Sequence, residues 1–286
     1  MPDTLESIMT ELRGRINTED TTTTVDMKEV EELKKNTVVI MPAGGKGTRI
    51  RAETKSEGIN KVMIRIDEEQ SMIEKAIKDY AACGITKFVV LTGFLAERVE
   101  EHLGDGSKWG LEIKYSRDPD GKKVGNGGAI LHALNSGIID DSLTAIIHNP
   151  DDVIVGMERP YGEVFLEGHL KGRKNGCIGT FIVVPESPFQ YSGLIIEKGK
   201  VLDITKYPPI AIPAHTGISV LDPEIYDYFR RLVSIEVESS FENVICPVIA
   251  GEGRLYAINI PPETWIPVND LKGIEAAASA LESGKF

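Results

Sequence analysis

Apolar runs alternate with helical patterns along the first half of the chain. Residues 38–41 and 88–92 are short continuous apolar runs, as expected for strands buried on both faces, and residues 111–115 form a third strand pattern. Between these runs, apolar residues recur at helical spacing over 72–83 and 96–103. Alternating strands and helices are typical of a parallel sheet covered on both faces. The pattern therefore predicts an α/β fold with a Rossmann-like, mostly parallel sheet.

The second half continues the alternation less regularly. Its pattern predicts a helix around 130–134, a strand over 145–154, a helix over 163–173, a strand over 177–184, a hairpin followed by a loop over 191–208, a strand over 215–221 and a last helix over 271–281. Residues 37–286 therefore form the main domain, with the hairpin as a small β insertion.

Residues 1–36 stand apart from this domain. Apolar residues recur at helical spacing between Leu5 and Ile16, although Gly14 and the threonine run at 21–24 interrupt the pattern, and a second short charged helix is expected at 27–35. We expect an N-terminal extension, partly helical or mobile, with a contact between subunits of an oligomer as the alternative.

Composition narrows the class of protein. The chain has 286 residues, 41% of them hydrophobic, and a net charge of −12 with a pI near 5.0, which argues against nucleic acid as a partner. No apolar run reaches the ~18 residues of a membrane span, and the N-terminus has no secretory pattern. The three cysteines lack paired metal-ligand spacing and fit free thiols, so we expect a cytoplasmic protein without a membrane partner.

A glycine-rich loop follows the first strand. Glycines lack a Cβ, so the loop backbone can bend and bring several N–H groups close to an anion. The candidate phosphate-binding residues are Ala43, Gly44, Gly45, Gly47 and Thr48.

Positive charge is concentrated on the same stretch. Residues 46–65 hold six basic and two acidic residues in a chain that is acidic overall. Arg49 offers a planar fork of donors for a polyphosphate, and Lys61 adds a compact charge. An ordinary glycine turn after a strand is the alternative interpretation of the loop alone.

The sequence AGGKGTRI at 43–50, followed by NKVM at 60–63, resembles the opening of the sugar-1-phosphate nucleotidyltransferase family, and the resemblance extends over roughly residues 37–281. It implies that Arg49, Lys61 and Asp152 are catalytic. Asn60 stands where the family has proline, and we expect it to leave the backbone of Lys61 less rigidly set.

A second glycine turn, VGNGGA at 124–129, precedes the helix pattern at 130–134 and resembles the family's nucleoside-binding element. A helix N-terminus offers free N–H groups and a favourable dipole to a nucleotide. Gly125 and Asn126 are the candidate contacts, and an ordinary helix cap is the alternative.

The strand pattern at 145–154 ends in two carboxylates. Asp152 matches the aspartate of a family element that binds a metal ion, and Mg²⁺ prefers oxygen ligands. Pro267 replaces the family's second aspartate, so we choose Asn269 as the second ligand, with Asp270 in reserve.

The resemblance also assigns sugar-phosphate contacts. Gly193 and Lys206 on the predicted hairpin match family residues, although Thr205 replaces a glutamate. His215 and Thr216 lie in a stretch that resembles a strand lining the sugar pocket. A histidine at the edge of the core is the equal alternative for His215.

The resemblance implies transfer of a nucleotidyl group from an NTP to a sugar 1-phosphate, with Mg²⁺ as cofactor and a homo-oligomer as a possible assembly. A nucleotidyltransferase for another phosphorylated alcohol and a non-catalytic nucleotide or NDP-sugar sensor are the alternatives. The base, the acceptor, the second metal ligand, the assembly state and the role of residues 1–36 stay open.

Overall fold

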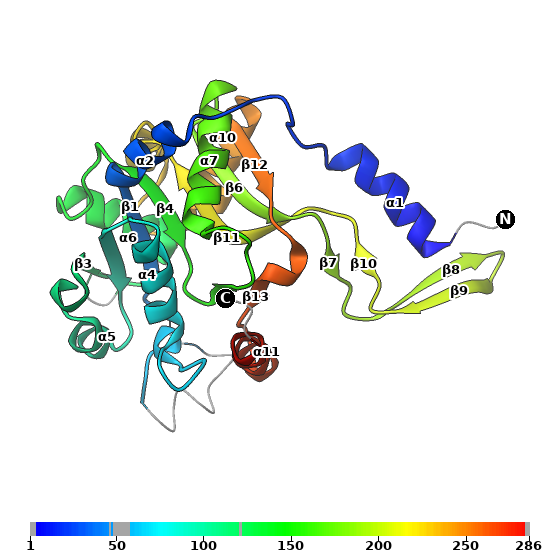
Figure 1. Cartoon of the computed structure of the whole chain (residues 1–286), viewed down its shortest axis with the longest axis horizontal. Coiled ribbons are helices and arrows are strands. Elements are labelled where there is room, and N and C mark those ends of the chain that lie inside the picture. The colour runs from blue at the N-terminus through cyan, green and yellow to red at the C-terminus, as the bar shows by residue number, and fades with distance from the viewer. Residues whose placement is uncertain (1–3, 46, 48–57, 120–121, 284–286) are drawn as a thin grey trace.

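The computed structural model describes residues 4–45, 47, 58–119 and 122–283. A seven-stranded sheet lies at its centre, in the order β12-β6-β11-β4-β1-β2-β3 (Figure 1). The strands are β1 (Thr37–Ala43), β2 (Lys87–Thr92), β3 (Glu112–Arg117), β4 (Thr144–His148), β6 (Gly179–Val184), β11 (Ala214–Leu221) and β12 (Leu255–Asn259). Only β11 pairs antiparallel with its neighbours within this sheet, so the predicted mostly parallel α/β fold is confirmed.

Helices cover both faces of the sheet. One face packs against α2 (Met27–Lys35), α4 (Met72–Ala82), α5 (Ala96–Leu103) and α7 (Tyr161–Lys174). The other face packs against α6 (Gly125–Asn135), α8 (Ile225–Leu232), α9 (Phe241–Val244) and α10 (Cys246–Gly251).

The first strand shows why its sequence is apolar throughout. Val39 and Met41 belong to the core on one face, while Val38 and Ile40 belong to the core on the other. Because both faces of the strand are buried, successive residues need apolar side chains whichever face they point to. The continuous apolar runs of the sequence are therefore the signature of this two-sided sheet.

A third hydrophobic cluster lies beside the sheet. It joins α11 (Leu271–Glu282) to the antiparallel pair of β5 (Asp152–Ile154) and β13 (Trp265–Pro267). Within the described residues there are also the short helices η2 (Lys61–Met63), η3 (Ser107–Trp109) and η4 (Pro262–Thr264). This cluster anchors the segments that follow β1 and β4.

The predicted elements agree closely with the observed ones where the pattern is strong. Helices α2 and α5 have the expected bounds, whereas the strand predicted over 145–154 divides into β4 and β5 around a turn. Helix α1 (Leu5–Ile16) continues through Gly14, and a capping box at Thr4 and Ser7 supports its start. Strand β12 and helix α8 were not predicted.

The two helices of the first 36 residues differ in their packing. Val30 and Leu33 of α2 are buried in the main core, and Lys34 pairs with Glu163 of α7. In contrast, α1 contains no buried residue and lies away from the body of the protein (Figure 1). Among residues 4–36, α1 is therefore the element that lies outside the main core.

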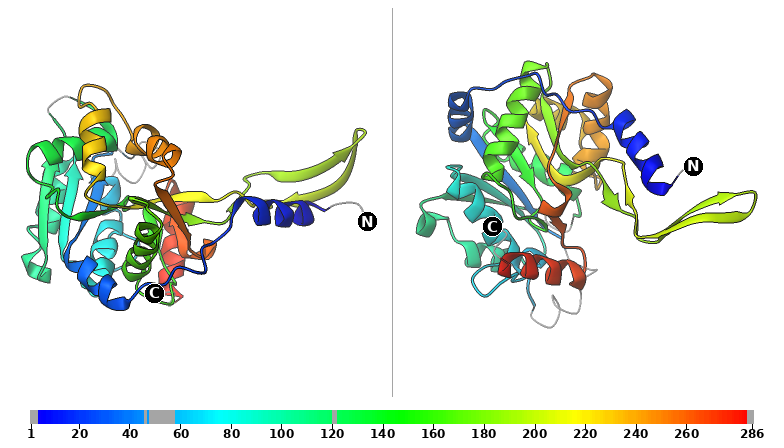
Figure 2. Two further views of the ribbon diagram at one scale, coloured as in Figure 1. Left: turned by 90° about the horizontal axis from the view of Figure 1, so that it is seen from above. Right: turned by 45° about the vertical axis from the view of Figure 1, so that its right-hand side comes forward.

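A hairpin projects from the sheet edge beside α1 (Figure 2). It consists of β8 (Ser192–Glu197) and β9 (Lys200–Lys206), joined to the body through the short pair β7 (Ser187–Pro188) and β10 (Pro209–Ile210). We call residues 192–206 the arm. Among the described residues, no helix is both long and apolar enough to cross a bilayer.

Asn60 overturns one expectation from the sequence. Its buried amide nitrogen donates to the carbonyl oxygens of Ala43 at 2.8 Å and Phe94 at 2.6 Å, and its side-chain oxygen accepts from the N–H of Val62 at 3.2 Å. The expectation that Asn60 leaves Lys61 loosely set is wrong, because the amide joins three segments that proline could not join.

Replacing Asn60 with Ala or Asp should lower the free energy of unfolding by about 1–3 kcal/mol, because each change removes the donor to the carbonyl oxygens of Ala43 and Phe94, the first of which is buried. Urea denaturation measures the effect. Asn243→Ala, at an exposed position, is the matched control and should stay within ~0.5 kcal/mol of the unmodified protein. Equal stability of Asn60→Asp and the unmodified protein would contradict the proposed role of the donor.

Candidate functional site

The carboxyl ends of β1 and β4 form the candidate site. These strands are parallel neighbours, so the segments that follow them leave the same edge of the sheet. Gly44 and Gly45 follow β1, and residues 149–152 follow β4. Strand β11 runs in the opposite direction and pairs Ile218 with His148, which brings its beginning to this edge.

Asp152 is held by side chains from two segments. The indole N–H of Trp265 donates to Asp152 Oδ1 at 3.0 Å, and the amide of Asn149 donates to Oδ2 at 3.3 Å. Burial of the carboxyl group, together with the neighbouring Asp151, raises the pKa of Asp152 to about 7. The two donors offset only part of this cost of burial.

Gly217 makes room for this carboxylate. A Cβ at Gly217 would fall well inside van der Waals contact with Asp152 Oδ2 and 2.6 Å from Asn149 Nδ2. Gly217 also has φ of +80°, a conformation that L side chains rarely adopt. Two independent requirements therefore favour glycine at this position.

The buried side chains of His148 and Tyr80 form a hydrogen-bonded pair that holds the backbone of Asp152. His148 Nε2 lies 2.9 Å from the carbonyl oxygen of Asp152, and its Nδ1 lies 2.9 Å from the hydroxyl of Tyr80. Burial lowers the pKa of His148 to about 4, so the ring is neutral near pH 7 and can donate to Asp152 while accepting from Tyr80.

Lys61 contacts the aspartate next to Asp152. It begins η2, directly after Asn60, and forms an ion pair with Asp151. The ion pair brings Lys61 to the residue next to Asp152. The predicted catalytic roles of Lys61 and Asp152 stay predictions. Arg49 and Thr48 lie outside the described residues, so the structure does not test their roles.

The glycine loop has open and crowded positions. A Cβ at Gly45 would meet no atom of the described residues within 4 Å, whereas at Gly44 it would lie 3.1 Å from Asp118 Oδ2. Gly47 has φ of +56°. Ala43, the last residue of β1, is buried, and its carbonyl oxygen accepts from the Asn60 amide. The predicted phosphate-binding role of these residues stays a prediction.

The second glycine turn is covered by residues 239–242. The N–H of Gly127 donates to Ser239 O at 3.0 Å, and the Asn126 amide donates to both oxygens of Glu242 at 3.0 Å. A Cβ at Gly125 would collide with the backbone of Ser239. The expected free N–H groups are therefore partly engaged, and contacts from Gly125 and Asn126 to a nucleotide stay a prediction.

His215 and Thr216 lie at a β-bulge of β11, next to Gly217. The ring of His215 stacks on Phe181 with centroids 4.0 Å apart, and its Nε2 lies 3.0 Å from the carbonyl oxygen of Ile218. The buried hydroxyl of Thr216 donates to Ile182 O at 2.9 Å. These contacts match the alternative of a histidine at the core edge, and they engage the hydroxyl of Thr216. The predicted sugar contacts of both residues stay predictions.

Gly193 and Lys206 lie on the arm. A Cβ at Gly193 would meet Pro208 and Leu5 rather than open space. Lys206 Nζ lies 5.0 Å from the centre of the Tyr207 ring. Their predicted contacts with the sugar phosphate stay untested.

The segment after β13 carries the expected second metal ligand. Pro267 pairs in register with Asp152, and Val268 N donates to Asp151 O at 2.7 Å. Asn269 is therefore the next residue after two that contact the aspartates. The reserve candidate Asp270 caps α11 by accepting from Gly273 N at 3.0 Å. The described residues contain no group of three or more His, Cys, Asp or Glu that could hold a metal ion.

Sequence reasoning missed several residues of the site. Asn149 donates to Asp152, and Gly217 leaves space for its carboxylate. Asp118 lies against Gly44, and burial raises the pKa of Asp118. The only signal for Asp118 was a carboxylate directly after a strand. Its contact with the glycine loop depends on tertiary structure and cannot be seen in the sequence.

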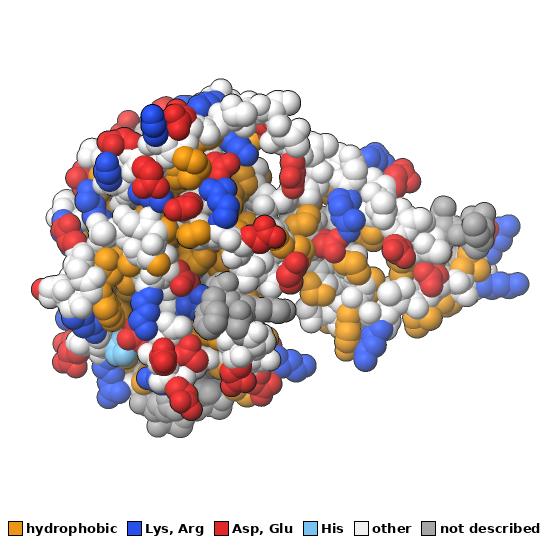
Figure 3. All heavy atoms as spheres, viewed as in Figure 1, with side chains coloured by type: hydrophobic (Ala, Val, Ile, Leu, Met, Phe, Trp, Pro, Cys, Tyr) orange, Lys and Arg blue, Asp and Glu red, His pale blue; other side chains and the backbone are white. Residues whose placement is uncertain are grey.

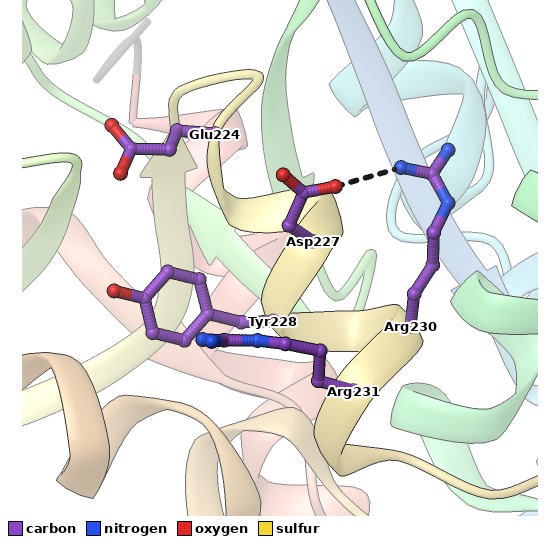
Figure 4. A pocket seen from close by; sticks show the side chains of 5 residues that line it. All are labelled: Glu224, Asp227, Tyr228, Arg230 and Arg231. Carbon is purple, nitrogen blue, oxygen red and sulfur yellow. Dashed lines mark hydrogen bonds and ion pairs between the residues drawn. The ribbon is translucent and has the colours of Figure 1, made fainter.

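Two surface hollows lie away from this edge. One is formed by Glu224 and the α8 residues Asp227, Tyr228, Arg230 and Arg231, where Arg231 stacks on Tyr228 at 4.7 Å (Figure 4). The other lies between α2 and α7 near the amino end of β4 and includes Asn36, Thr144 and Arg173. Neither includes a predicted site residue.

The chain is similar to proteins named as glucose-1-phosphate nucleotidyltransferases. A UTP–glucose-1-phosphate uridylyltransferase of Synechocystis is 26% identical over 245 residues, covering 79% of this chain and 58% of that protein. A glucose-1-phosphate adenylyltransferase of Thermotoga maritima is 26% identical over 243 residues, covering 78% of this chain and 55% of that protein. The chain thus spans less than two thirds of these relatives.

A solved structure named as a glucose-1-phosphate thymidylyltransferase of Bacillus anthracis, in complex with sucrose, shares the fold. Its TM-score is 0.64 at 20% identity, covering 85% of this chain and 94% of that one. The family model described as nucleotidyl transferase matches residues 37–283, which include every element of the sheet. The chain belongs to the nucleotidyl transferase family.

Proposed function

We propose that the protein transfers a nucleotidyl group from an NTP to a sugar 1-phosphate, giving an NDP-sugar and pyrophosphate. The observation that supports this most directly is the meeting of Lys61, Asp151 and Asp152 at the edge from which the glycine loop leaves. The names of the relatives, which act on glucose 1-phosphate, support the substrate class.

The chemistry needs alignment and charge stabilisation more than covalent catalysis. An oxygen of the sugar phosphate attacks the α-phosphorus, and the bond from that phosphorus to the pyrophosphate oxygen breaks. The nucleophile is already an anion, so no general base is required. In this proposal Lys206 holds the sugar phosphate, Lys61 neutralises charge between the reactants, and Arg49 with the loop amides receives the pyrophosphate.

The residues at the edge also fit a divalent cation such as Mg²⁺. Asp152 has hydrogen-bond donors but no ion-pair partner among the described residues, and its raised pKa shows that a nearby positive charge would stabilise the ionised form. In this proposal Asp152 and Asn269 hold the ion. When bound, Mg²⁺ neutralises phosphate charge and brings two anionic reactants together.

A matrix of NTPs against sugar 1-phosphates with Mg²⁺ tests the proposed function. We expect pyrophosphate release with at least one pair, dependent on both substrates. Release with phosphorylated polyols or choline phosphate alone would change the acceptor class. Binding of an NDP-sugar without turnover of any NTP would instead identify a sensor.

Asp152→Asn should lower the rate of pyrophosphate release by about a hundredfold or more, the scale of one lost transition-state contact. Asp141→Asn, which removes an exposed carboxylate that pairs with Arg230, is the control and should leave the rate unchanged. A near-normal rate for Asp152→Asn would remove this residue from the mechanism.

Gly217→Ala should lower the same rate at least tenfold, because the new methyl group displaces the carboxylate of Asp152. Gly176→Ala is the matched control, since Gly176 has the same φ of +80° but no atom within 4 Å of the added Cβ. The control reproduces the backbone strain without the collision. Equal rates for the two variants would show that the collision with Asp152 is unimportant.

A further inference from the structure

His148 and Tyr80 are polar side chains buried in the core beside the turn of residues 149–152, which we call the aspartate turn. Their exposed fractions are 1% and 0%, in contrast to the charged side chains that lie in solvent across the face of the body in Figure 3. The ring of Tyr161 packs edge-on against Tyr80, with centroids 5.0 Å apart. Apolar side chains of similar shape would fill this space without the cost of burying polar atoms. Packing alone therefore does not explain the pair.

The hydrogen bonds of this pair run in one direction. The carbonyl oxygen of Asp152 can only accept, so the proton of His148 lies on Nε2, 2.9 Å away. Nδ1 of the neutral ring is then an acceptor, and the hydroxyl of Tyr80 donates to it at 2.9 Å. Both ring nitrogens are thus paired, and the ring is held in one orientation from both ends.

The strand pair of β5 and β13 leaves the carbonyl group of Asp152 to His148. Val268 N donates to Asp151 O at 2.7 Å, so the next residues in register, Asp152 and Pro267, are a non-hydrogen-bonded pair. The backbone carbonyl of Asp152 therefore points away from β13. His148 supplies the donor that this carbonyl does not receive from the strand pair.

We propose that His148, oriented by Tyr80, is a positioning residue for the reaction, an inference that rests on the proposed function. The bond from His148 fixes the backbone of Asp152, and the carboxylate is placed by this backbone together with Asn149 and Trp265. Without the Nε2 donor, the carbonyl regains a partner only from water, which requires the aspartate turn to move toward solvent. The carboxylate then leaves the position that the reaction needs.

The indole signals of the protein report this placement without any substrate. The chain has two tryptophans, so a proton–nitrogen correlation spectrum shows two indole N–H signals, and that of Trp265 depends on its bond to Asp152. Trp109→Phe identifies the two signals. His148→Phe should shift the Trp265 signal and leave that of Trp109 in place, whereas His148→Gln, which retains an N–H donor, should keep both. This result is separate from the outcome for the proposed function.

The rate of pyrophosphate release gives the second measurement. His148→Phe and Tyr80→Phe should each lower this rate about tenfold or more, because misplacing a reacting group by ~1 Å costs up to a hundredfold. His148→Gln should restore most of the rate. Tyr226→Phe is the matched control, since this buried hydroxyl donates to Leu143 O at 3.1 Å in the core on the other face of the sheet.

The two tyrosine variants separate positioning from stability. Each loses one buried hydrogen bond, so urea denaturation should show similar losses of stability, yet only Tyr80→Phe should lose activity and shift the Trp265 signal. Tyr80→Phe removes a single oxygen atom from the core, so it decides the question even where His148→Phe does not fold. Equal rates for Tyr80→Phe and Tyr226→Phe, or an unshifted Trp265 signal in Tyr80→Phe, would overturn the inference.

Discussion

A carboxyl group enclosed at the edge of the sheet is the constraint on which the site depends. Removing the charge of Asp152 from water costs free energy unless polar groups replace the lost solvent. Trp265 and Asn149 supply these groups, while Gly217 leaves the space that the carboxylate occupies. Three segments distant in sequence must therefore reach the same place before Asp152 is correctly oriented.

The architecture of the sheet makes this meeting possible. Adjacent parallel strands deliver the glycine loop and the aspartate turn to one edge, and the antiparallel β11 returns Gly217 to it. Below the edge, neutral His148 links the backbone of Asp152 to Tyr80, whose ring packs at 87° against Tyr161. The aspartate turn is thus supported by the aromatic core rather than by solvent-exposed contacts.

The sequence predicts the parts of this arrangement that follow from periodicity. Buried parallel strands need apolar residues on both faces, so β1 and β2 were visible without a structure. Strand β12 was missed because its residues are only partly buried and leave a weaker pattern. The antiparallel direction of β11 was also invisible, since direction depends on a connection through the arm.

Side-chain substitutions that preserve a role by different chemistry were harder to predict. Asn60 replaces a rigid ring with hydrogen bonds to carbonyl oxygens 17 and 34 residues away, and only the fold shows that these partners are near. Gly217 was overlooked because its sequence neighbours His215 and Thr216 have more obvious chemistry. Their polar groups are engaged in the bulge of β11, whereas the residue without a side chain faces the carboxylate.

The connection of the arm gives it a physical link to this carboxylate. The chain runs from β6 through β7, the arm and β10 into β11, so the arm is inserted between two neighbouring strands of the sheet. Its return strand ends at Lys206, and the bulge that carries Gly217 follows within the next eleven residues. Because β11 pairs with β4 just before Asp152, the segment that returns from the arm leads directly into the strand that faces this carboxylate.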